Sequence, residues 1–190
     1  GMRALAILML GGGKRISLAQ RFKAAATTRG LQLKVHAYEI DAQQPISAVA
    51  NIIVGKKWSD PGVRADLERV LVEQKIDLLV SNVDLGTVLH AALKDGFAAA
   101  AFSSGAQVVA TCMSKNRTQD YCEAAGIPII PRAQANEFPQ FAKPDAGSAS
   151  MGAMLVRNKA ERDAIIGKEI NYIFQKYVDG VEYTVDAYVT

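Results

Sequence analysis

Residues 4–14 read Ala-Leu-Ala-Ile-Leu-Met-Leu-Gly-Gly-Gly-Lys, and this stretch decides the fold class of the first part of the chain. Its apolar residues form a continuous run without the alternation of a half-solvated strand. Such a run is typical of a central parallel strand that is buried on both faces. The glycines that follow end the strand and precede a helical pattern, so we expect a strand-to-helix turn at Gly11 to Lys14.

Apolar runs and amphipathic stretches continue to alternate up to about residue 113. Asp84 follows one of these runs directly, where it is expected to cap the next helix. Alternation of this kind predicts right-handed crossovers and an open parallel, Rossmann-like sheet with helices on both faces. The expected strands are 4–10, 31–40, 52–54, 76–80 and 107–110, and the expected helices are 17–29, 63–71 and 84–95.

The composition changes after residue 113, where prolines become frequent and the apolar segments become shorter. Short strands around one helix, joined by short turns, predict a small α+β subdomain. The expected helices are 115–125 and 159–166, and the expected strands are 153–156, 172–175 and 182–190. We therefore expect an α/β protein with two domains, residues 1–113 and 114–190.

The bulk composition excludes several classes of protein. Of the 190 residues, 49% are apolar and 22% are charged, so a packed core is expected and disorder is not. The net charge of +3, without basic runs interleaved with aromatics, argues against a nucleic-acid partner. Cys112 and Cys122 belong to no metal-binding pattern and are expected to be free thiols. The first apolar run is too short for a membrane helix, so no membrane partner and a cytoplasmic location are expected.

The first tract with a chemical signature is Phe141-Ala142-Lys143-Pro144-Asp145-Ala146-Gly147-Ser148-Ala149-Ser150-Met151-Gly152. A lysine on a strand is a compact cation that suits a phosphate oxygen. The glycines let backbone N–H groups approach an anion closely, and the serines add hydroxyl donors. A surface hairpin with a solvated lysine is the alternative for this tract taken alone.

The second tract is Phe174-Gln175-Lys176-Tyr177-Val178-Asp179-Gly180-Val181-Glu182-Tyr183-Thr184-Val185-Asp186. Gln175 to Val178 is expected to leave a strand and enter a linker whose backbone groups match an adenine edge. Val178 would cover a ring face, and Glu182 would accept hydrogen bonds from ribose hydroxyls. An amphipathic hairpin with an exposed Glu182 is the alternative here.

Together, in this order and spacing, the two tracts resemble the ATP-grasp enzymes, and most closely the branch of the carbamoyl-phosphate synthase large subunit. The resemblance covers most of the chain. It implies that residues 2–113 form a pre-ATP-grasp domain and that residues 114–190 form the first, N-terminal lobe of the grasp. The implied activity is that of an ATP-dependent carboxylate–amine or carboxylate–amide ligase with an acylphosphate intermediate.

The resemblance also implies roles for individual residues. Lys143 would contact the α- and β-phosphates, and Lys115 would be a further phosphate contact. Lys176 and Val178 would hydrogen-bond adenine through their backbones, and Glu182 would hold the ribose. The other residues implied to line the ATP site are Gly147, Ser148, Ala149, Ser150, Met151 and Gly152, which form a mobile flap, with Gln175 and Tyr177. The family often has Asp-Lys where this chain has Ser114-Lys115.

ATP-grasp enzymes hold Mg²⁺ with a Glu and a Glu-x-Asn pair on a second lobe, and no such set follows Glu182. ATP and Mg²⁺ are thus the expected cofactors, with the metal ligands on a C-terminal lobe absent from this sequence. We expect no catalytic residue in residues 1–190, no turnover by the isolated chain, and a homodimer or other oligomer formed through the uncovered C-terminal strands.

Two other functions are compatible with the sequence. The chain can be a truncated, non-enzymatic remnant that binds nucleotide weakly. It can also be a Rossmann-type dinucleotide binder, in which Asp41 would hold a ribose, although the spacing of Gly11 to Gly13 fits neither common phosphate-loop pattern. In the ligase hypothesis, Gly12, Gly13 and Asp84 would instead lie on the side of an unknown carboxylate substrate.

Overall fold

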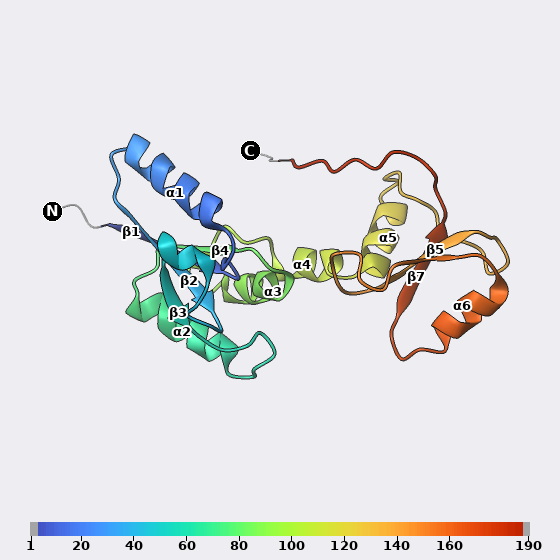
Figure 1. Ribbon diagram of the computed structural model, residues 1–190, viewed down its shortest axis with the longest axis horizontal. Helices are drawn as coiled ribbons and strands as arrows, with labels where there is room; N and C mark the ends of the chain where they lie inside the picture. The colour runs from blue at the N-terminus through green and yellow to red at the C-terminus, as the bar shows by residue number, and fades with distance from the viewer. Residues whose placement is uncertain (1–3, 188–190) are drawn as a thin grey trace. The chain divides into compact units, whose positions relative to one another are not determined.

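The computed structural model describes residues 4–187. The chain divides between Ala110 and Thr111 into two compact units. Each unit has its own sheet and its own hydrophobic core. Figure 1 follows the chain from the first unit, in blue to green, to the second, in yellow to red.

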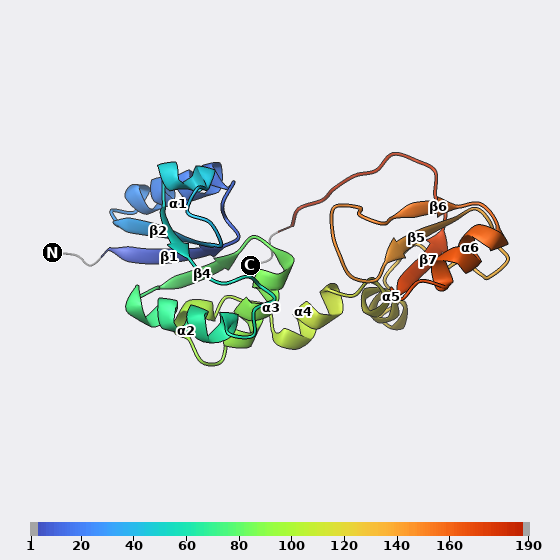
Figure 2. The ribbon, with the colours of Figure 1, turned by 60° about the horizontal axis from the view of Figure 1, so that its bottom comes forward.

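The first unit is an open parallel sheet with helices on both faces, as the sequence predicts. Its strand order is β3-β2-β1-β4. Figure 2 shows α1 on one side of this sheet and α2 and α3 on the other. The elements are β1 (Leu5–Leu10), α1 (Ile16–Thr28), β2 (Leu33–Glu39), η1 (Pro45–Ala48), β3 (Asn51–Val54), α2 (Val63–Glu73), β4 (Leu78–Ser81), α3 (Asp84–Leu93) and η2 (Ala98–Ala100). Helix α4 (Ala106–Cys112) begins in the first unit and ends just past the division.

Strand β1 lies between two hydrophobic clusters, which explains its unbroken apolar sequence. Leu8 and Leu10 pack into the cluster that includes Leu67 of α2. Met9, which points to the opposite face, packs into the cluster that includes Ala19 of α1. Since both faces of a central parallel strand are covered by helices, each side chain of the strand must be apolar.

The second unit is a small antiparallel sheet of order β6-β5-β7 with one helix on each face. Ala142 of β5 packs against Ile165 of α6 on one face. On the other face, Gln175 of β7 reaches Gln119 of α5. The elements are α5 (Lys115–Ala124), β5 (Gln140–Pro144), β6 (Met154–Val156), α6 (Lys159–Ile166) and β7 (Tyr172–Lys176).

Three predicted features of the fold are wrong. Residues 107–110 belong to helix α4, in which Val109 is buried and Val108 is 54% exposed, so the β-branched pair does not form a strand. Asp84 is the first residue of α3, and Val83 is its N-cap. Residues 182–187 have no strand structure, although their sequence alternates, because no strand among residues 4–187 pairs with them. The rest of that predicted strand, 188–190, lies outside the described residues.

Candidate functional site

Both tracts singled out in the sequence line one cavity of about 620 Å³ in the second unit. Both lysines and apolar side chains contribute to its wall. Because the lining comes from α5, β5, the glycine–serine loop and the segment after β7, it depends on contacts between distant residues. The predicted residues that line it are Lys115, Lys143, Gly147, Ser148, Ala149, Ser150, Met151, Gln175, Lys176, Tyr177, Val178 and Glu182.

Asp145 joins the start of α5 to the end of β5. Its carboxylate accepts the Ser114 hydroxyl at 2.9 Å and the Asn116 backbone N–H at 2.8 Å. Ser114 also caps α5 by accepting the N–H of Arg117 at 3.1 Å. The acid that the sequence lacks next to Lys115 is therefore supplied from residue 145, at the head of the glycine–serine loop.

The pKa of Asp145 is lowered from its ordinary value of 3.8. Burial, the largest single contribution, disfavours the carboxylate and raises the pKa. The hydrogen bonds from Asn116 and Ser114 and the positive charge of Lys115 favour the carboxylate and together outweigh burial. The folded second unit thus favours the ionised form of Asp145.

The two lysines predicted to meet phosphates differ in their surroundings. The Nζ of Lys115 donates to the Gly147 carbonyl at 2.9 Å, so this ammonium holds the base of the loop. The Nζ of Lys143 lies 5.5 Å from the centroid of the Phe141 ring, on the same face of β5. Lys143 makes no ion pair with any residue between 4 and 187. Its charge is therefore available to a ligand.

The glycine–serine loop is built from left-handed backbone conformations. Gly147 has a φ of 113° and Gly152 a φ of 75°, while Ala149 and Ser150 each have a φ of 56°. A Cβ at Gly152 would also lie 2.9 Å from the Pro144 Cγ, so only glycine fits that position. The loop closes against β5 at Gly152, although Gly152 itself is not among the residues that line the cavity.

Gln175 has a structural role that the sequence does not reveal. Its side chain is buried, and its amide donates to the Gln119 side-chain carbonyl at 2.9 Å. Gln119 in turn donates to the Ile130 carbonyl at 3.1 Å. These bonds fix β7 to α5 and to the segment after α5, which forms part of the cavity wall.

The last residue of β7, Lys176, carries groups that are already engaged in the protein. The N–H of Lys176 donates to the Pro131 carbonyl at 2.9 Å, and its Nζ pairs with Glu137 at 2.7 Å. Both the backbone N–H and the ammonium of Lys176 are therefore engaged within the second unit. Val178 and Glu182 line the cavity with exposed side chains.

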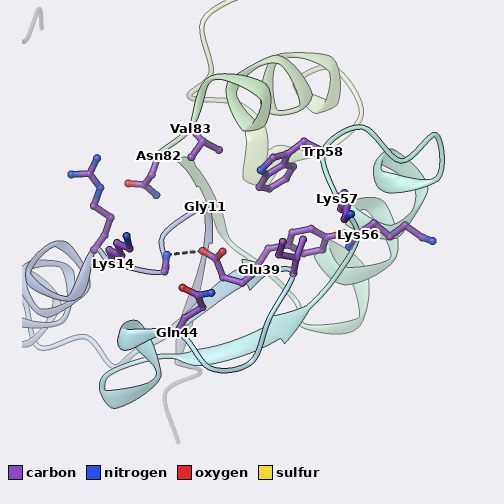
Figure 3. Close-up of a pocket in the computed structure, with 13 residues that line it drawn as sticks. Gly11, Lys14, Glu39, Gln44, Lys56, Lys57, Trp58, Asn82 and Val83 are labelled. Atoms are coloured by element: carbon purple, nitrogen blue, oxygen red, sulfur yellow. Dashed lines mark hydrogen bonds between the residues drawn. The ribbon is translucent and has the colours of Figure 1, made fainter. Parts of the chain in front are cut away.

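A separate cavity, also of about 620 Å³, lies in the first unit at the carboxyl ends of the parallel strands. Figure 3 shows Lys14 and Asn82 at one side of it and Trp58 at the other, with Glu39 between them. The Gly13 N–H donates to the Glu39 carboxylate at 2.6 Å. Burial raises the pKa of Glu39, and the Gly13 hydrogen bond opposes that shift in part.

The residues predicted on a substrate side are not brought together here. Gly13 lines the cavity of the first unit, whereas Gly12 is buried in the turn, where an added Cβ would lie 3.1 Å from the Met9 Cβ. Asp84 is exposed and does not line the cavity. Asp41, proposed for a ribose, is also absent from the lining and accepts the N–H of Gln43 at 2.8 Å.

Sequence reasoning missed Glu39 and Trp58, which do line this cavity. Glu39 is the last residue of β2, so its position at a strand end next to a glycine turn was a usable signal. Trp58 lies in a loop with no motif. Its place over the cavity depends on packing against Tyr38, with ring centroids 5.7 Å apart.

Residues 4–187 hold no group of three or more His, Cys, Asp or Glu side chains arranged to bind a metal ion. They also hold no helix that combines the length and the apolar character needed to span a bilayer.

Comparison with known proteins shows what this fold is similar to. No protein-family model and no curated protein sequence matches the chain. Among solved structures, the N5-carboxyaminoimidazole synthetase from Staphylococcus aureus complexed with ADP aligns over 94% of this chain and 49% of its own, with a TM-score of 0.67 and 15% identity. The L-amino acid ligase from Bacillus licheniformis aligns over 95% of this chain and 46% of its own, with a TM-score of 0.69 and 14% identity.

A third similar structure is the biotin carboxylase domain of the Hydrogenobacter thermophilus 2-oxoglutarate carboxylase, complexed with MgADP, ADP and bicarbonate. It aligns over 94% of this chain and 45% of its own, with a TM-score of 0.65 and 15% identity. The chain thus spans about half the length of these structures. At such low identity the likeness shows the fold alone, which is that of the N-terminal part of ATP-grasp enzymes.

Proposed function

We propose that the second unit binds ATP in its cavity and that the chain is the nucleotide-binding part of an ATP-grasp carboxylate–amine or carboxylate–amide ligase. The observation that carries this proposal is the convergence of Lys143, the loop 147–151 and the segment 175–182 on one cavity. Similar structures of this fold are complexed with ADP, which supports a nucleotide as the ligand. The closer resemblance to the carbamoyl-phosphate synthase branch rests on the sequence tracts.

The charges of the cavity suit the two ends of a nucleotide. Lys115 and Lys143 lie at the glycine–serine loop, where a polyphosphate would find two cations, backbone N–H groups and two serine hydroxyls. Ile130, Phe141 and Val178 supply apolar surface for a purine. Glu182 is the one acidic side chain among the lining residues within 4–187 and would accept hydrogen bonds from a ribose.

In this function, the chain's own residues position ATP and neutralise its phosphates. Such positioning and charge neutralisation are the main contributions that proteins make to phosphoryl transfer. Lys115, held against the Gly147 carbonyl, would couple phosphate binding to the position of the loop. Lys143, without an ion pair in the described part of the chain, would provide its charge directly.

The described residues do not fit a magnesium site. Mg²⁺ requires several hard oxygen ligands, and residues 4–187 hold no cluster of three or more suitable side chains. We expect this chain by itself to bind ATP without measurable hydrolysis or ligation; turnover by the isolated chain would contradict that expectation.

The proposal is tested by calorimetric titration of the chain with ATP. The Lys143→Gln variant removes one unpaired cation and should weaken ATP binding about tenfold, which corresponds to about 1.4 kcal/mol. Lys168→Gln is the matched control, because Lys168 is an exposed lysine of the same unit that does not line the cavity. The ATP affinity of Lys168→Gln should stay within about twofold of the ATP affinity of the unmodified chain.

Two results would count against ATP binding at this cavity. One is an absence of heat at millimolar ATP, as expected for a remnant that has lost the function. The other is an equal affinity of the Lys143→Gln and Lys168→Gln variants, which would place the nucleotide elsewhere. A dinucleotide at the glycine turn of the first unit is disfavoured, because the Gly13 N–H already donates to Glu39.

Two further parts of the proposal concern the chain's surroundings. Self-association through the exposed C-terminal lobe stays a prediction, for light scattering to check. It is supported by Val181, Tyr183 and Val185, whose side chains are 78%, 81% and 84% exposed. A carboxylate substrate, a cytoplasmic location and the absence of nucleic-acid and membrane partners are also predictions from the sequence.

A further inference from the structure

The cavity of the first unit lies where an open parallel sheet commonly binds a ligand. The chain runs from β1 outward to β2 and β3 and then returns to place β4 on the other side of β1. Ligands of such sheets bind beyond the carboxyl ends of the strands at this reversal of strand order. Gly11 follows β1, Glu39 ends β2, and Asn82 follows β4, and all three line the cavity.

Three cations of the cavity form no ion pair with any residue in the described part of the chain. Lys14, Arg15 and Lys57 line the cavity, and their side chains make no ion pair or hydrogen bond with residues 4–187. Lys56, which also lines it, differs, because its Nζ pairs with Asp60 at 3.7 Å. Helix α1 begins beside Arg15 with no acidic residue in its first turn. Cations at the N-terminal end of a helix are unfavourable. An anion bound there would be stabilised both by the positive side chains and by the helix N-terminus.

The opposite side of the cavity offers an aromatic surface in a fixed position. Trp58 packs on the fully buried Tyr38 at a ring-centroid distance of 5.7 Å. The Tyr38 hydroxyl accepts the Lys56 N–H at 2.8 Å and donates to Asp66 at 2.6 Å. Gly55 permits this packing, because a Cβ there would lie 2.0 Å from the Tyr38 ring. Figure 3 shows Trp58 across the cavity from Lys14.

Glu39 determines which way round an anion would lie. Its carboxylate is held between the two sides by the Gly13 N–H. A second negative charge placed over Glu39 would be repelled, whereas one at Lys14 and Arg15 would be attracted. The acidic group of a ligand therefore belongs at the Lys14 side, and the uncharged part belongs toward Trp58.

We propose that this cavity is a second small-molecule site, which takes a small organic anion bearing a flat ring. The carboxylate or phosphate group lies at Lys14 and Arg15, and the ring lies against Trp58. This site is separate from the cavity proposed for ATP, and its occupation does not depend on that proposal.

Trp58 makes the site directly measurable, because it is the only tryptophan in the sequence. The full chain is titrated with phenyl phosphate and with benzoate while the Trp58 fluorescence is recorded. Inorganic phosphate, which has no ring, and benzyl alcohol, which has no charge, are the comparison compounds. At least one ring-bearing anion should give a saturable change, at an affinity about tenfold or more above those of both comparison compounds. The tighter of the two acids identifies the acidic group.

Variants of the chain then assign the response to the cavity. Lys14→Gln should weaken binding of the tighter acid about tenfold. Lys34→Gln is the matched control, since Lys34 is exposed, lies in the same unit and does not line the cavity; its affinity should change less than twofold. In Trp58→Leu, a calorimetric titration should show a loss of about tenfold relative to the unmodified chain.

Several results would overturn the proposal. A contribution of the ring to binding is excluded if inorganic phosphate binds as tightly as phenyl phosphate. A contribution of the negative charge is excluded if benzyl alcohol gives the same response as the ring-bearing acids. It is also excluded if Lys14→Gln and Lys34→Gln bind the tighter acid with equal affinity. The site as a whole is excluded if no compound changes the Trp58 signal at millimolar concentration. If ATP competes with phenyl phosphate for the Trp58 response, the cavity is a nucleotide site and not the separate site proposed here.

Discussion

The two cavities have similar volumes, about 620 Å³ each, but they are built in different ways. The cavity of the first unit lies at the carboxyl edge of a parallel sheet, and its position follows from the order of the strands. The cavity of the second unit depends on a few polar side chains that connect distant segments. Asp145 joins β5 to α5, and Gln175 joins β7 to α5.

This difference indicates where each unit is sensitive to mutation. A sheet-edge cavity should tolerate changes of its lining, provided that the core beneath it stays packed. A cavity held by polar side chains should be lost when one of those side chains is removed, since each buried partner is then left without a hydrogen bond. Trp58 lies in the first unit, so its fluorescence reports on that unit alone.

Replacement of Asp145 should have the largest effect. Asp145→Ala removes the acceptor of the Ser114 hydroxyl and of the Asn116 N–H, both of which belong to the start of α5. Loss of these charge-assisted bonds should destabilise the second unit by about 3 kcal/mol. The measurement is denaturant unfolding followed by circular dichroism, with Trp58 fluorescence recorded in parallel.

Asp145→Asn is the matched variant, because it keeps one side-chain acceptor oxygen while it removes the charge and the second acceptor. It should cost less than Asp145→Ala. An equal shift of the circular dichroism and Trp58 transitions in Asp145→Ala would contradict the comparison, since it would mean that the two units unfold together.

Replacement of Gly55 should have the next largest effect, and it should act on the first unit. The new Cβ in Gly55→Ala would lie 2.0 Å from the Tyr38 ring, so Tyr38 and the Trp58 packed on it must move. Overpacking of this kind costs about 2 kcal/mol. The unfolding transition reported by Trp58 should shift to lower denaturant concentration.

Gly96→Ala is the control for this variant, because a Cβ there would meet only the Leu93 carbonyl, at 3.9 Å. It should leave the Trp58 transition nearly unchanged. If Gly55→Ala were as stable as Gly96→Ala, the packing of Trp58 on Tyr38 would not be a fixed feature of the cavity.

The smallest effect concerns pH and again belongs to the second unit. Because the pKa of folded Asp145 is below 3.8, its contribution to stability is fully present above the ordinary carboxyl range and is lost as the pH falls through the folded pKa. The stability difference between the unmodified chain and Asp145→Asn should therefore shrink as the pH is lowered from 7 toward about 3. A difference that is constant over this range would show that the ionised carboxylate is not what holds α5.

Local pattern predicted much of the fold. The unbroken apolar run of β1 and the helical stripe of α2 are strong signals, because burial on two faces or on one leaves a clear period in the sequence. Val108 and Val109 misled the prediction because β-branched residues favour strands on average, whereas the packing of this segment makes it helical. Residues 182–187 alternate like a strand, but alternation supplies no partner strand.

The sequence could predict which residues belong to the candidate nucleotide site, but not which tertiary contacts hold them in place. The two tracts identified Lys143 and the segment 175–182, and these residues line one cavity. Nothing in the sequence indicated that Gln175 would be buried against Gln119. The polar partners of a buried side chain are set by tertiary packing, which leaves no period or motif in the chain.

By itself, the sequence determined the parallel sheet of the first unit, the small α+β subdomain that follows it and the tracts that carry a phosphate-binding signature. The tertiary structure alone decided that Asp145 supplies the acid next to Lys115, that Glu39 rather than Asp41 lines the first cavity, and that Trp58 lies across it from Lys14. The physical reason is the distance along the chain over which each kind of interaction acts. Periodicity and turn chemistry act between neighbours along the chain, whereas a site is made by side chains that only folding brings together.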